Sequence, residues 1–395
     1  MDMQSVKTDN KTAFVNSIDL SIHDSISSLK NAWLELEQDC PISVYQRHGW
    51  VEEFIGTYKD NENIKPYIIV GKLNDEIVFL LPLAIAGKYI KRIQFIGGTH
   101  SNFNLGIFSS KFDYMIDGEV IAQIFKRICA LNSCIGYLTL TCQPKQWRGK
   151  QNPLMHLPHQ ASTAPAFVLK LGGSFEDALA HGNAKRKRKK FRQQSRMCES
   201  AGGHELVIAK NKEDISLLLE TFLEQKAAQL KEMGIKNTFD DKRTFDFLQK
   251  LATKSLKLDE PLLRLYGLKV GGKIVATFGA GVLKNRMSGY FSSMDRAQHA
   301  SLSPGEMLIY LIVQDACEKG YEQIDFGRGE ERYKTSWSSE KRMMYDVIVP
   351  ISWMSVPIVA ARLFVRRLHR IVRGNPKLWQ TYKTIRSYKA KYLPA

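Results

Sequence analysis

The spacing of hydrophobic positions in the first 145 residues changes from helical to strand-like. Ile26, Leu29 and Trp33 recur at three- and four-residue steps within 25–39, and 46–58 follows the same pattern, which predicts two helices. Continuous apolar runs bounded by turn residues come next and predict strands. After the two helices we expect strands at 64–72, 76–86, 89–98 and 136–142, with a helix at 117–132 before the last of them.

A similar order of elements occupies 166–350. Gly271 and Gly272 separate two apolar runs and predict a hairpin, and Gly320 is placed to end a helix. The expected strands lie at 166–171, 204–210, 262–270, 273–283, 287–294, 322–326 and 343–350. The expected helices are a basic one within 183–196 and others at 212–232, 241–254 and 305–319.

Together these series predict a mixed α/β protein of the α+β kind with two tandem domains, each a mostly antiparallel mixed sheet flanked by helices. The segment between them is rich in Pro, Gln and Asn and is expected to be a connector. We therefore expect an N-terminal tail at 1–24, a first domain at 25–145, a linker at 146–165, a second domain at 166–350 and a basic amphipathic helical tail at 351–395.

The composition narrows the class of protein. With 395 residues, 44% hydrophobic and 25% charged, the chain is long enough for at least two cores and is neither disordered throughout, collagen-like nor a multi-span membrane protein. Its six cysteines contain no C-x-x-C pair, which suits free thiols in a reducing compartment. The first residues show no secretory pattern, so we expect a cytoplasmic protein.

The net charge of +17 comes from two short segments. Residues 183–196 carry eight bases and 351–395 carry ten, and neither segment contains an acid. Outside them 39 bases face 40 acids, so the rest of the chain is close to neutral. The basic charge is therefore local, and each segment needs its own explanation.

The C-terminal segment has an apolar stripe at helical spacing, with arginines on its other faces. The stripe consists of Val356, Val359, Leu363, Phe364, Leu368, Ile371 and Val372. It predicts either a helix on an anionic membrane surface at the inner face of the plasma membrane or a helix that caps the adjacent domain, and both interpretations remain open. The uncharged run at 347–361 is too short to span a bilayer.

The K-R-K-R-K-K run at 185–190 has three interpretations: a nucleic-acid or localisation patch, a solvated helix face, or an anion-binding helix beside an active site. The chain has none of the sequence signatures of nucleic-acid recognition modules, so we do not expect a specific nucleic acid as partner.

The string SPGEMLIYLIVQDACEKGYEQIDFGRGEERYKTSW at 303–337 resembles the signature of BioF2-like acetyltransferases, the CelD-type proteins associated with cellulose and exopolysaccharide biosynthesis. The element order in 200–350 resembles the GNAT acyltransferase fold. Pro41, Trp50 and the strings LLPLAIAG and IGGTHSNFN resemble the N-terminal half of the same proteins, so the resemblance covers 25–350. The paired arrangement is more distantly similar to Fem-type peptidyltransferases, which use aminoacyl-tRNA.

The resemblance implies two tandem GNAT-like domains and an acyl-CoA donor, with acetyl-CoA as the example. GNAT enzymes usually carry a Q/R-x-x-G-x-G/A loop before the central helix, whereas the corresponding stretch 296–305 has Gly305 as its one glycine. Another activated donor, such as an aminoacyl-tRNA, therefore stays open.

Helix starts bind phosphate because their free amide groups and positive dipole end face outward. Ser303, Pro304 and Gly305 supply an N-cap, a first-turn residue and a position open to close approach, although ordinary capping explains the same tripeptide. We predict a donor-binding set of Arg296, Ser301, Ser303 and Gly305.

The glycine-bracketed loop after strand 322–326 supplies the predicted catalytic residues. Arg328 is suited to clamp a carboxylate or phosphate, and Asp325 or Glu330 to accept a proton. Lys334 is suited to neutralise developing charge and Tyr333 to protonate a leaving thiolate. An ion-paired turn with packed aromatics is the alternative.

The predicted substrate-binding residues come from three places: the basic helix, the end of the Y-K-x-x-W motif, and a polar loop at a strand end in the first domain. They are Lys189, Arg192, Trp337, His100, Asn102 and Asn104. His156 and His159 have metal-like spacing but lack nearby acidic or thiol ligands, so no metal is expected.

Three functions follow. The first is an N-acyltransferase that moves an acyl group from acyl-CoA to an amino or hydroxyl group of a sugar or a cell-envelope or polysaccharide precursor. The second is a Fem-like transferase that takes aminoacyl-tRNA. The third is a non-enzymatic adaptor at a membrane surface in exopolysaccharide assembly.

Overall fold

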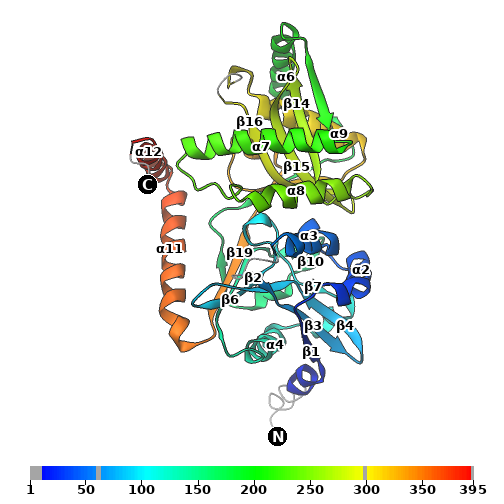
Figure 1. The fold of residues 1–395 in the computed structure, drawn as a ribbon, viewed down its shortest axis with the longest axis vertical. Helices are drawn as coiled ribbons and strands as arrows, with labels where there is room; N and C mark the ends of the chain where they lie inside the picture. Colours follow the sequence, from blue (N-terminus) through cyan, green and yellow to red (C-terminus); the bar gives the residue numbers. More distant parts are fainter. Residues whose placement is uncertain (1–10, 59–63, 297–299, 393–395) are drawn as a thin grey trace. The chain divides into compact units, whose positions relative to one another are not determined.

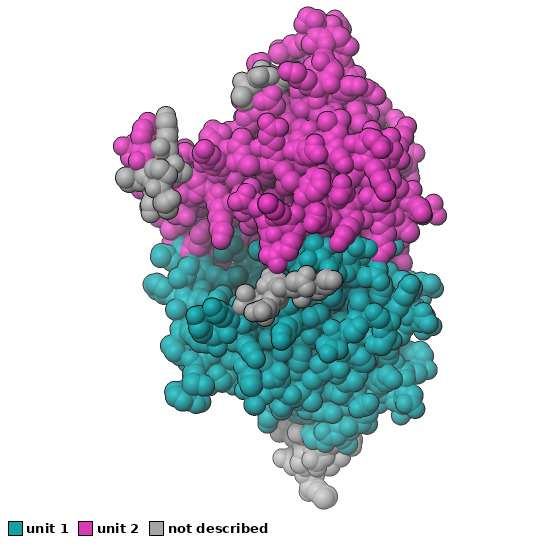
Figure 2. Space-filling model, in the orientation of Figure 1, with its two compact units in different colours: residues 1–163, 343–368 teal, residues 164–342, 369–395 magenta. Residues whose placement is uncertain are grey.

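The computed structural model describes residues 11–58, 64–296 and 300–392. The chain forms two compact units, which Figure 2 colours separately. Unit 1 comprises Met1–Thr163 and Met343–Leu368, and unit 2 comprises Ala164–Arg342 and His369–Ala395. Each unit contains a mixed sheet flanked by helices, so the predicted mixed α/β class is confirmed.

Unit 1 contains a four-stranded sheet in the order β1-β3-β4-β7 and a six-stranded sheet in the order β11-β19-β8-β6-β5-β2. The strands of the first sheet are β1 (Asp19–His23), β3 (Ile68–Leu73), β4 (Glu76–Leu81) and β7 (Ile107–Phe108). Those of the second are β2 (Ile64–Pro66), β5 (Leu83–Ala86), β6 (Lys91–Phe95), β8 (Ile135–Pro144), β11 (His159–Ala161) and β19 (Met344–Pro350). Helices α2 (Lys30–Asp39), α3 (His48–Tyr58) and α4 (Gly118–Ala130) accompany them.

Two predicted strands of unit 1 are each divided between its sheets. The run at 76–86 becomes β4 and β5, and the break falls at Pro82, which has no N–H for a ladder. The run at 64–72 likewise becomes β2 and β3. The apolar pattern continues through both breaks, which is why the sequence predicted single strands.

The strand at 343–350 was expected to close the second domain, and that prediction is wrong. It forms β19, which pairs antiparallel with β8 and with β11 in the sheet of unit 1. The expected connector also contains regular structure, including β11 and the short strands β9 (Gln146–Trp147) and β10 (Lys150–Gln151). Residues 19–23, expected in the tail, form β1 on the edge of β3.

Unit 2 is built on one seven-stranded sheet in the order β13-β14-β15-β16-β17-β12-β18. Its strands are β12 (Ala166–Lys170), β13 (His204–Ile208), β14 (Arg264–Val270), β15 (Lys273–Leu283), β16 (Arg286–Met294), β17 (Gln323–Arg328) and β18 (Glu340–Arg342). Its helices are α5 (Phe175–Ala180), α6 (Ala184–Glu199), α7 (Lys212–Glu232), α8 (Lys242–Ser255), α9 (Pro304–Glu318) and α10 (Arg332–Trp337).

Helices cover both faces of this sheet (Figure 1). Tyr266 of β14 belongs to the core that includes residues of α5, α6 and α9. A Cβ on the next residue, Gly267, would touch Leu218 of α7. Because successive strand residues point to opposite faces, α7 and α9 lie on opposite sides of the sheet.

The predicted C-terminal tail forms two helices, α11 (Val356–Gly374) and α12 (Pro376–Tyr392). Asn375 separates them, and its side-chain oxygen accepts hydrogen bonds from the amides of Lys377 and Leu378. The α11 side chain Val359 is buried with Tyr137 of β8. Within the described part of the chain, no helix combines the length and the apolarity needed to cross a membrane.

Candidate functional site

The main cleft of unit 2 lies where two parallel strands separate. β16 and β17 pair only from Arg286 to Ser288 and from Gln323 to Asp325. Beyond this point β16 stays with β15 as far as Met294, while β17 stays with β12. The divergence leaves a cleft of about 560 Å³ at the sheet's centre.

Residues from both faces of the sheet line this cleft. They come from α7 (Lys226, Gln229, Glu232, Met233), from β15 and β16 (Thr277, Phe278, Ser292, Ser293, Met294), from the loop and start of α9 (Asp295, Arg296, Ser303, Pro304, Gly305, Glu306, Leu308, Ile309) and from α10 and the residue before it (Glu331, Arg332, Tyr333). The cleft therefore has walls formed by elements on both faces of the sheet.

The start of α9 borders the cleft, but it is not capped as predicted. Ser303 has φ 52° and ψ 57°, and its side chain makes no capping hydrogen bond. Instead, the buried Gln194 side chain of α6 donates to the Leu302 carbonyl at 2.7 Å and to the Ser303 carbonyl at 3.2 Å. A Cβ on Gly305 would lie 3.0 Å from the Met294 sulfur, so glycine keeps this wall open.

The other two predicted donor-binding residues differ in position. Arg296 lines the cleft and pairs with Glu232 at 3.3 Å. Ser301 is exposed in a short 3-10 turn (Ala300–Leu302) and is not among the cleft residues. Residues 297–299 of the same predicted loop lie outside the described residues.

Tyr333 is the one predicted catalytic residue that reaches the cleft among the residues described. Its hydroxyl shares a hydrogen bond with the Ser292 hydroxyl. Burial raises the pKa of this phenol, so Tyr333 stays protonated at neutral pH and is able to donate a proton.

A carboxylate and an amine that the sequence analysis did not select stand beside Tyr333. Burial alone would raise the pKa of Glu331, but the charge and hydrogen bond of Lys334 outweigh it, and the net pKa is lowered. Lys226 donates to the Ser292 carbonyl at 3.2 Å, and burial lowers the pKa of its ammonium. The cleft thus contains an ionised carboxylate next to a neutral phenol.

Lys334 positions this carboxylate and is not itself in the cleft. Its side chain is 6% exposed, pairs with Glu331 at 2.8 Å and donates to the Arg328 carbonyl at 2.6 Å. It closes the turn between β17 and α10. The Arg328 side chain also lies outside the cleft lining, so the predicted anion clamp does not form there.

The two predicted proton acceptors are engaged elsewhere. Asp325 is fully buried, 3.4 Å from the Arg286 guanidinium and 3.7 Å from that of Arg342, and burial raises its pKa. Glu330 pairs with Lys341 and Arg373 away from the cleft. Glu331, the neighbour of the predicted Glu330, lines the cleft together with Glu232, Asp295 and Glu306.

A pair of buried hydroxyl groups in the cleft was also not predicted from the sequence. The hydroxyls of Thr277 and Ser293 are 2.7 Å apart, and Ser293 donates to Gln225 at 2.7 Å. Thr277 interrupts an otherwise apolar strand. A polar residue at such a position indicates a buried hydrogen bond and could have identified this part of the cleft from the sequence.

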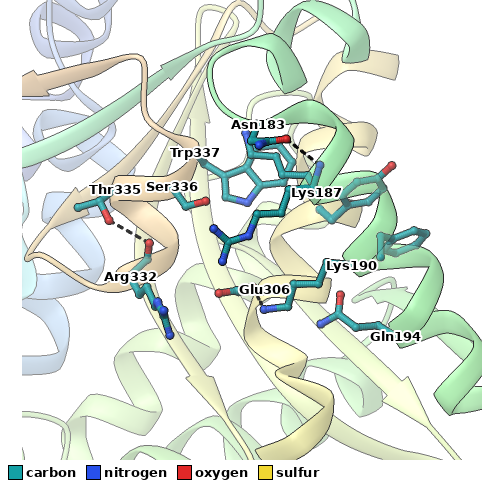
Figure 3. A pocket seen from close by; sticks show the side chains of 12 residues that line it. Asn183, Lys187, Lys190, Gln194, Glu306, Arg332, Thr335, Ser336 and Trp337 are labelled. Atoms are coloured by element: carbon teal, nitrogen blue, oxygen red, sulfur yellow. Dashed lines mark hydrogen bonds and ion pairs between the residues drawn. The ribbon is translucent and has the colours of Figure 1, made fainter.

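A second pocket of about 390 Å³ adjoins the cleft and shares Glu306 and Arg332 with it. We call it the α6 pocket, and Figure 3 shows it from close by. Its lining comes from α6 and the residue before it (Asn183, Arg186, Lys187, Lys190, Phe191, Gln194), from α9 (Glu306, Tyr310) and from α10 (Arg332, Thr335, Ser336, Trp337).

The two predicted substrate-binding residues on the basic helix face solvent and not the α6 pocket. Lys189 and Arg192 are exposed and do not line the pocket, whereas Lys187 and Lys190 do. The pocket face of α6 repeats at positions 187, 190 and 194, which is helical spacing. Six consecutive bases hid this periodicity from sequence analysis.

Trp337 is buried and forms the back of the α6 pocket, so this predicted residue lies in a cavity. The Lys187 ammonium lies 4.0 Å from the centre of its indole ring (Figure 3). Burial lowers the pKa of Lys187 to about 8. Next to it, Lys190 forms an ion pair with Glu306.

The three residues predicted from the first domain make contacts inside unit 1. His100 lies beside Tyr58, Asn102 donates to the Tyr45 hydroxyl, and the buried Asn104 donates to the Thr141 carbonyl. They hold the loop after β6. Among the described residues, no group of three or more His, Cys, Asp and Glu is placed to hold a metal ion.

Comparisons with known proteins agree with this architecture. Residues 185–335 match the model of an acetyltransferase (GNAT) domain. No curated protein matches the sequence. A conserved protein of unknown function from Bacteroides thetaiotaomicron VPI-5482 has a similar structure, with a TM-score of 0.53, 12% identity, and coverage of 84% of this chain and 100% of that one.

Two further solved structures share the fold. FemX has a TM-score of 0.55 at 10% identity, with 84% of this chain and 97% of that one covered. The C-terminal domain of a putative lysylphosphatidylglycerol synthetase from Agrobacterium fabrum has a TM-score of 0.51 at 12% identity, with 86% and 95% covered. At these identities the likeness concerns the fold, and the similarity to an acetyltransferase (GNAT) domain concerns residues 185–335.

Proposed function

We propose that the protein is an N-acyltransferase of the BioF2-like kind that uses acyl-CoA. The observation that carries the proposal is the cleft between the separated strands β16 and β17, with the start of α9 on its border. Backbone amides at a helix start bind phosphate, and a cleft between diverging strands has room for an extended chain. A pantetheine arm with its pyrophosphate is an extended chain that ends in phosphate.

The cleft residues divide the acyl transfer between them. The acceptor amine attacks the acyl carbonyl of the thioester, the bond to sulfur breaks, and the sulfur leaves as thiolate. Tyr333 protonates the leaving thiolate, and Glu331 takes the proton that the amine loses. The attack is direct, so no covalent enzyme intermediate is required.

The acceptor that we propose is an amino or hydroxyl group of a sugar or cell-envelope precursor. The α7 side of the cleft, with Lys226, Gln229 and the Ser293 hydroxyl, offers donors and acceptors of hydrogen bonds to a polyol. An apolar acceptor would displace water from these polar groups without replacing its hydrogen bonds and would bind poorly.

Thiol release tests this proposal. The purified chain is incubated with acetyl-CoA and a panel of amino sugars and amines. We expect acceptor-dependent thiol release that Tyr333→Phe lowers about 100-fold in kcat, with the donor Kd unchanged. Tyr89→Phe is the matched control, because Tyr89 is 87% exposed outside unit 2.

If the protein neither binds acyl-CoA nor releases thiol, the proposal that acyl-CoA is the donor is refuted. The Fem-like alternative then predicts binding of aminoacyl-tRNA that weakens steeply as salt rises. If Tyr333→Phe keeps the full kcat of acyl transfer, Tyr333 is not the general acid. The fold assignment would be unaffected.

We also propose that the protein lies on an anionic membrane through α11. Phe364, Leu368 and Ile371 are 68%, 50% and 58% exposed and follow one another at helical spacing. The opposite face packs on the protein, where Arg366 pairs with Asp346. An exposed apolar row in a segment with ten bases and no acid complements an anionic lipid surface.

Vesicle sedimentation tests the membrane proposal. Full-length protein should bind vesicles containing phosphatidylglycerol and not pure phosphatidylcholine. Replacing Phe364 and Leu368 by Ser should weaken binding at least fivefold, whereas Leu217→Ser, at a site 51% exposed on α7, should not. A concentration-dependent dimer that the double variant abolishes, without vesicle binding, would instead assign the row to a second copy of the chain.

A further inference from the structure

The α6 pocket has a charge balance that the proposed acyl transfer does not use. Four cations line it, namely Arg186, Lys187, Lys190 and Arg332, against the one carboxylate of Glu306. Lys190 takes this carboxylate as its partner. Within the described ranges, the other three cations form no ion pair, so the pocket carries an uncompensated charge of about three.

The most unusual of these groups is Lys187. Its ammonium is buried and has no hydrogen-bond partner among the described residues. It rests on Trp337, and Gly182 leaves space for it, since a Cβ there would lie 2.9 Å from the lysine nitrogen. An unpaired buried charge destabilises a fold, whereas an apolar side chain of the same length would fill this space without that cost.

The walls of the pocket are aromatic. Phe191 and Tyr310 stack with ring centres 4.1 Å apart, and Tyr310 meets Trp337 edge to face at 6.1 Å. Ser336 and the buried Gln194 add polar groups to the lining (Figure 3). A volume of about 390 Å³ suits a small molecule and is too small for a folded partner.

The three cations that form no ion pair indicate how much negative charge the ligand carries. A carboxylate would neutralise one of the three, whereas a phosphomonoester carries about −1.5 to −2 and three acceptor oxygens. Arginine forks match phosphate oxygens in pairs, and Arg186 and Arg332 approach the pocket from different helices. Phosphate therefore fits both the charge and the donor geometry.

We propose that the α6 pocket binds the phosphate group of a small phosphorylated molecule, held by Arg186 and Arg332, with Lys187 turning from the Trp337 ring to complete the contact. Glu306 and Arg332 line both this pocket and the cleft. The phosphate therefore belongs either to the nucleotide end of the donor or to a phosphorylated acceptor. Phosphate binding itself does not depend on the proposed acyl transfer.

Titration calorimetry on the full chain without any acyl donor tests the site. The probes are inorganic phosphate, pyrophosphate, adenosine 3′,5′-bisphosphate and glucosamine 6-phosphate. We expect saturable binding of at least one probe that Lys187→Met weakens at least tenfold. Lys185→Met, an exposed lysine of the same helix outside the pocket lining, should change the Kd less than twofold.

Tryptophan fluorescence gives a second readout. When phosphate binds, the Lys187 ammonium should leave the Trp337 indole ring, and the tryptophan emission should change. Trp337→Phe should abolish this change. Competition by coenzyme A assigns the phosphate to the donor, whereas glucosamine 6-phosphate binding at saturating coenzyme A assigns it to the acceptor.

No saturable binding of any probe would overturn the proposal. Equal weakening by Lys187→Met and Lys185→Met would also overturn it, because the attraction would then be diffuse. Thiol release without phosphate binding would support the proposed acyl transfer and refute the phosphate site. Phosphate binding without thiol release would support the phosphate site and not the acyl transfer.

Discussion

Replacing Lys187 by Met should stabilise the protein at neutral pH. Burial lowers the pKa of this lysine from 10.5 to about 8, a difference of about 2.5. At 1.36 kcal/mol per pKa unit, keeping the charge costs up to about 3.4 kcal/mol. The Trp337 ring returns about 1 kcal/mol, and partial exposure of the side chain reduces the cost further, so we expect a net gain of about 1 to 2 kcal/mol.

The gain should depend on pH in a defined direction. Below pH 8 the lysine is protonated in both the folded and the unfolded chain, so the cost is present in full. Between about pH 8 and 10.5 the unfolded chain binds more protons than the folded one, and wild-type stability therefore rises with pH. The advantage of Lys187→Met should shrink over this window.

Urea unfolding at pH 7 and at pH 9.5, followed by circular dichroism, measures this difference. Lys185→Met is the control and should change stability by less than about 0.5 kcal/mol, because that side chain is exposed. A Lys187→Met protein that is less stable than wild type, or whose advantage does not change with pH, would refute the reasoning. A stable variant that no longer binds phosphate would separate binding from folding.

Three further predictions concern the surroundings of the cleft. Asp325→Ala removes the buried carboxylate that faces the Arg286 and Arg342 guanidinium groups and should lower the unfolding free energy by about 3 kcal/mol, as measured with urea. An unchanged urea midpoint would contradict the ion-pair account. Gln194→Ala removes the side-chain donor of the Leu302 carbonyl, while the Ser303 carbonyl keeps its bonds within α9, and it should cost about 1 to 2 kcal/mol of unfolding free energy while raising the donor KM. Gly305→Val places its side chain against Met294 and should weaken acyl-CoA binding in calorimetry at least tenfold, and tight binding would move the donor out of the cleft.

Local patterns predicted much of unit 2. The helix expected at 212–232 is α7, with the same bounds, and the Gly271-Gly272 hairpin forms as expected. These predictions succeed because helical and strand periods reflect which side of one element is buried. The start of α9 was also found, because its Ser-Pro-Gly tripeptide marks a helix boundary.

The candidate site was predicted less well because it depends on side-chain direction. Glu330 and Glu331 are adjacent in sequence, yet the turn closed by Lys334 sends only the second into the cleft. Lys187 and Lys189 belong to one unbroken basic run, and only packing against α9 and α10 decides which of them faces the pocket. No property of the residue types distinguishes the members of either pair.

The main strands and helices of unit 2, the two basic segments and the mixed α/β class were determined by the sequence alone, because each depends on neighbouring residues. The return of β19 to unit 1, the separation of β16 from β17 and the burial of Asp325 were decided by the tertiary structure. These features require pairing between segments that are far apart along the chain. Such pairing is chosen by the packing of the whole unit, which no local pattern records.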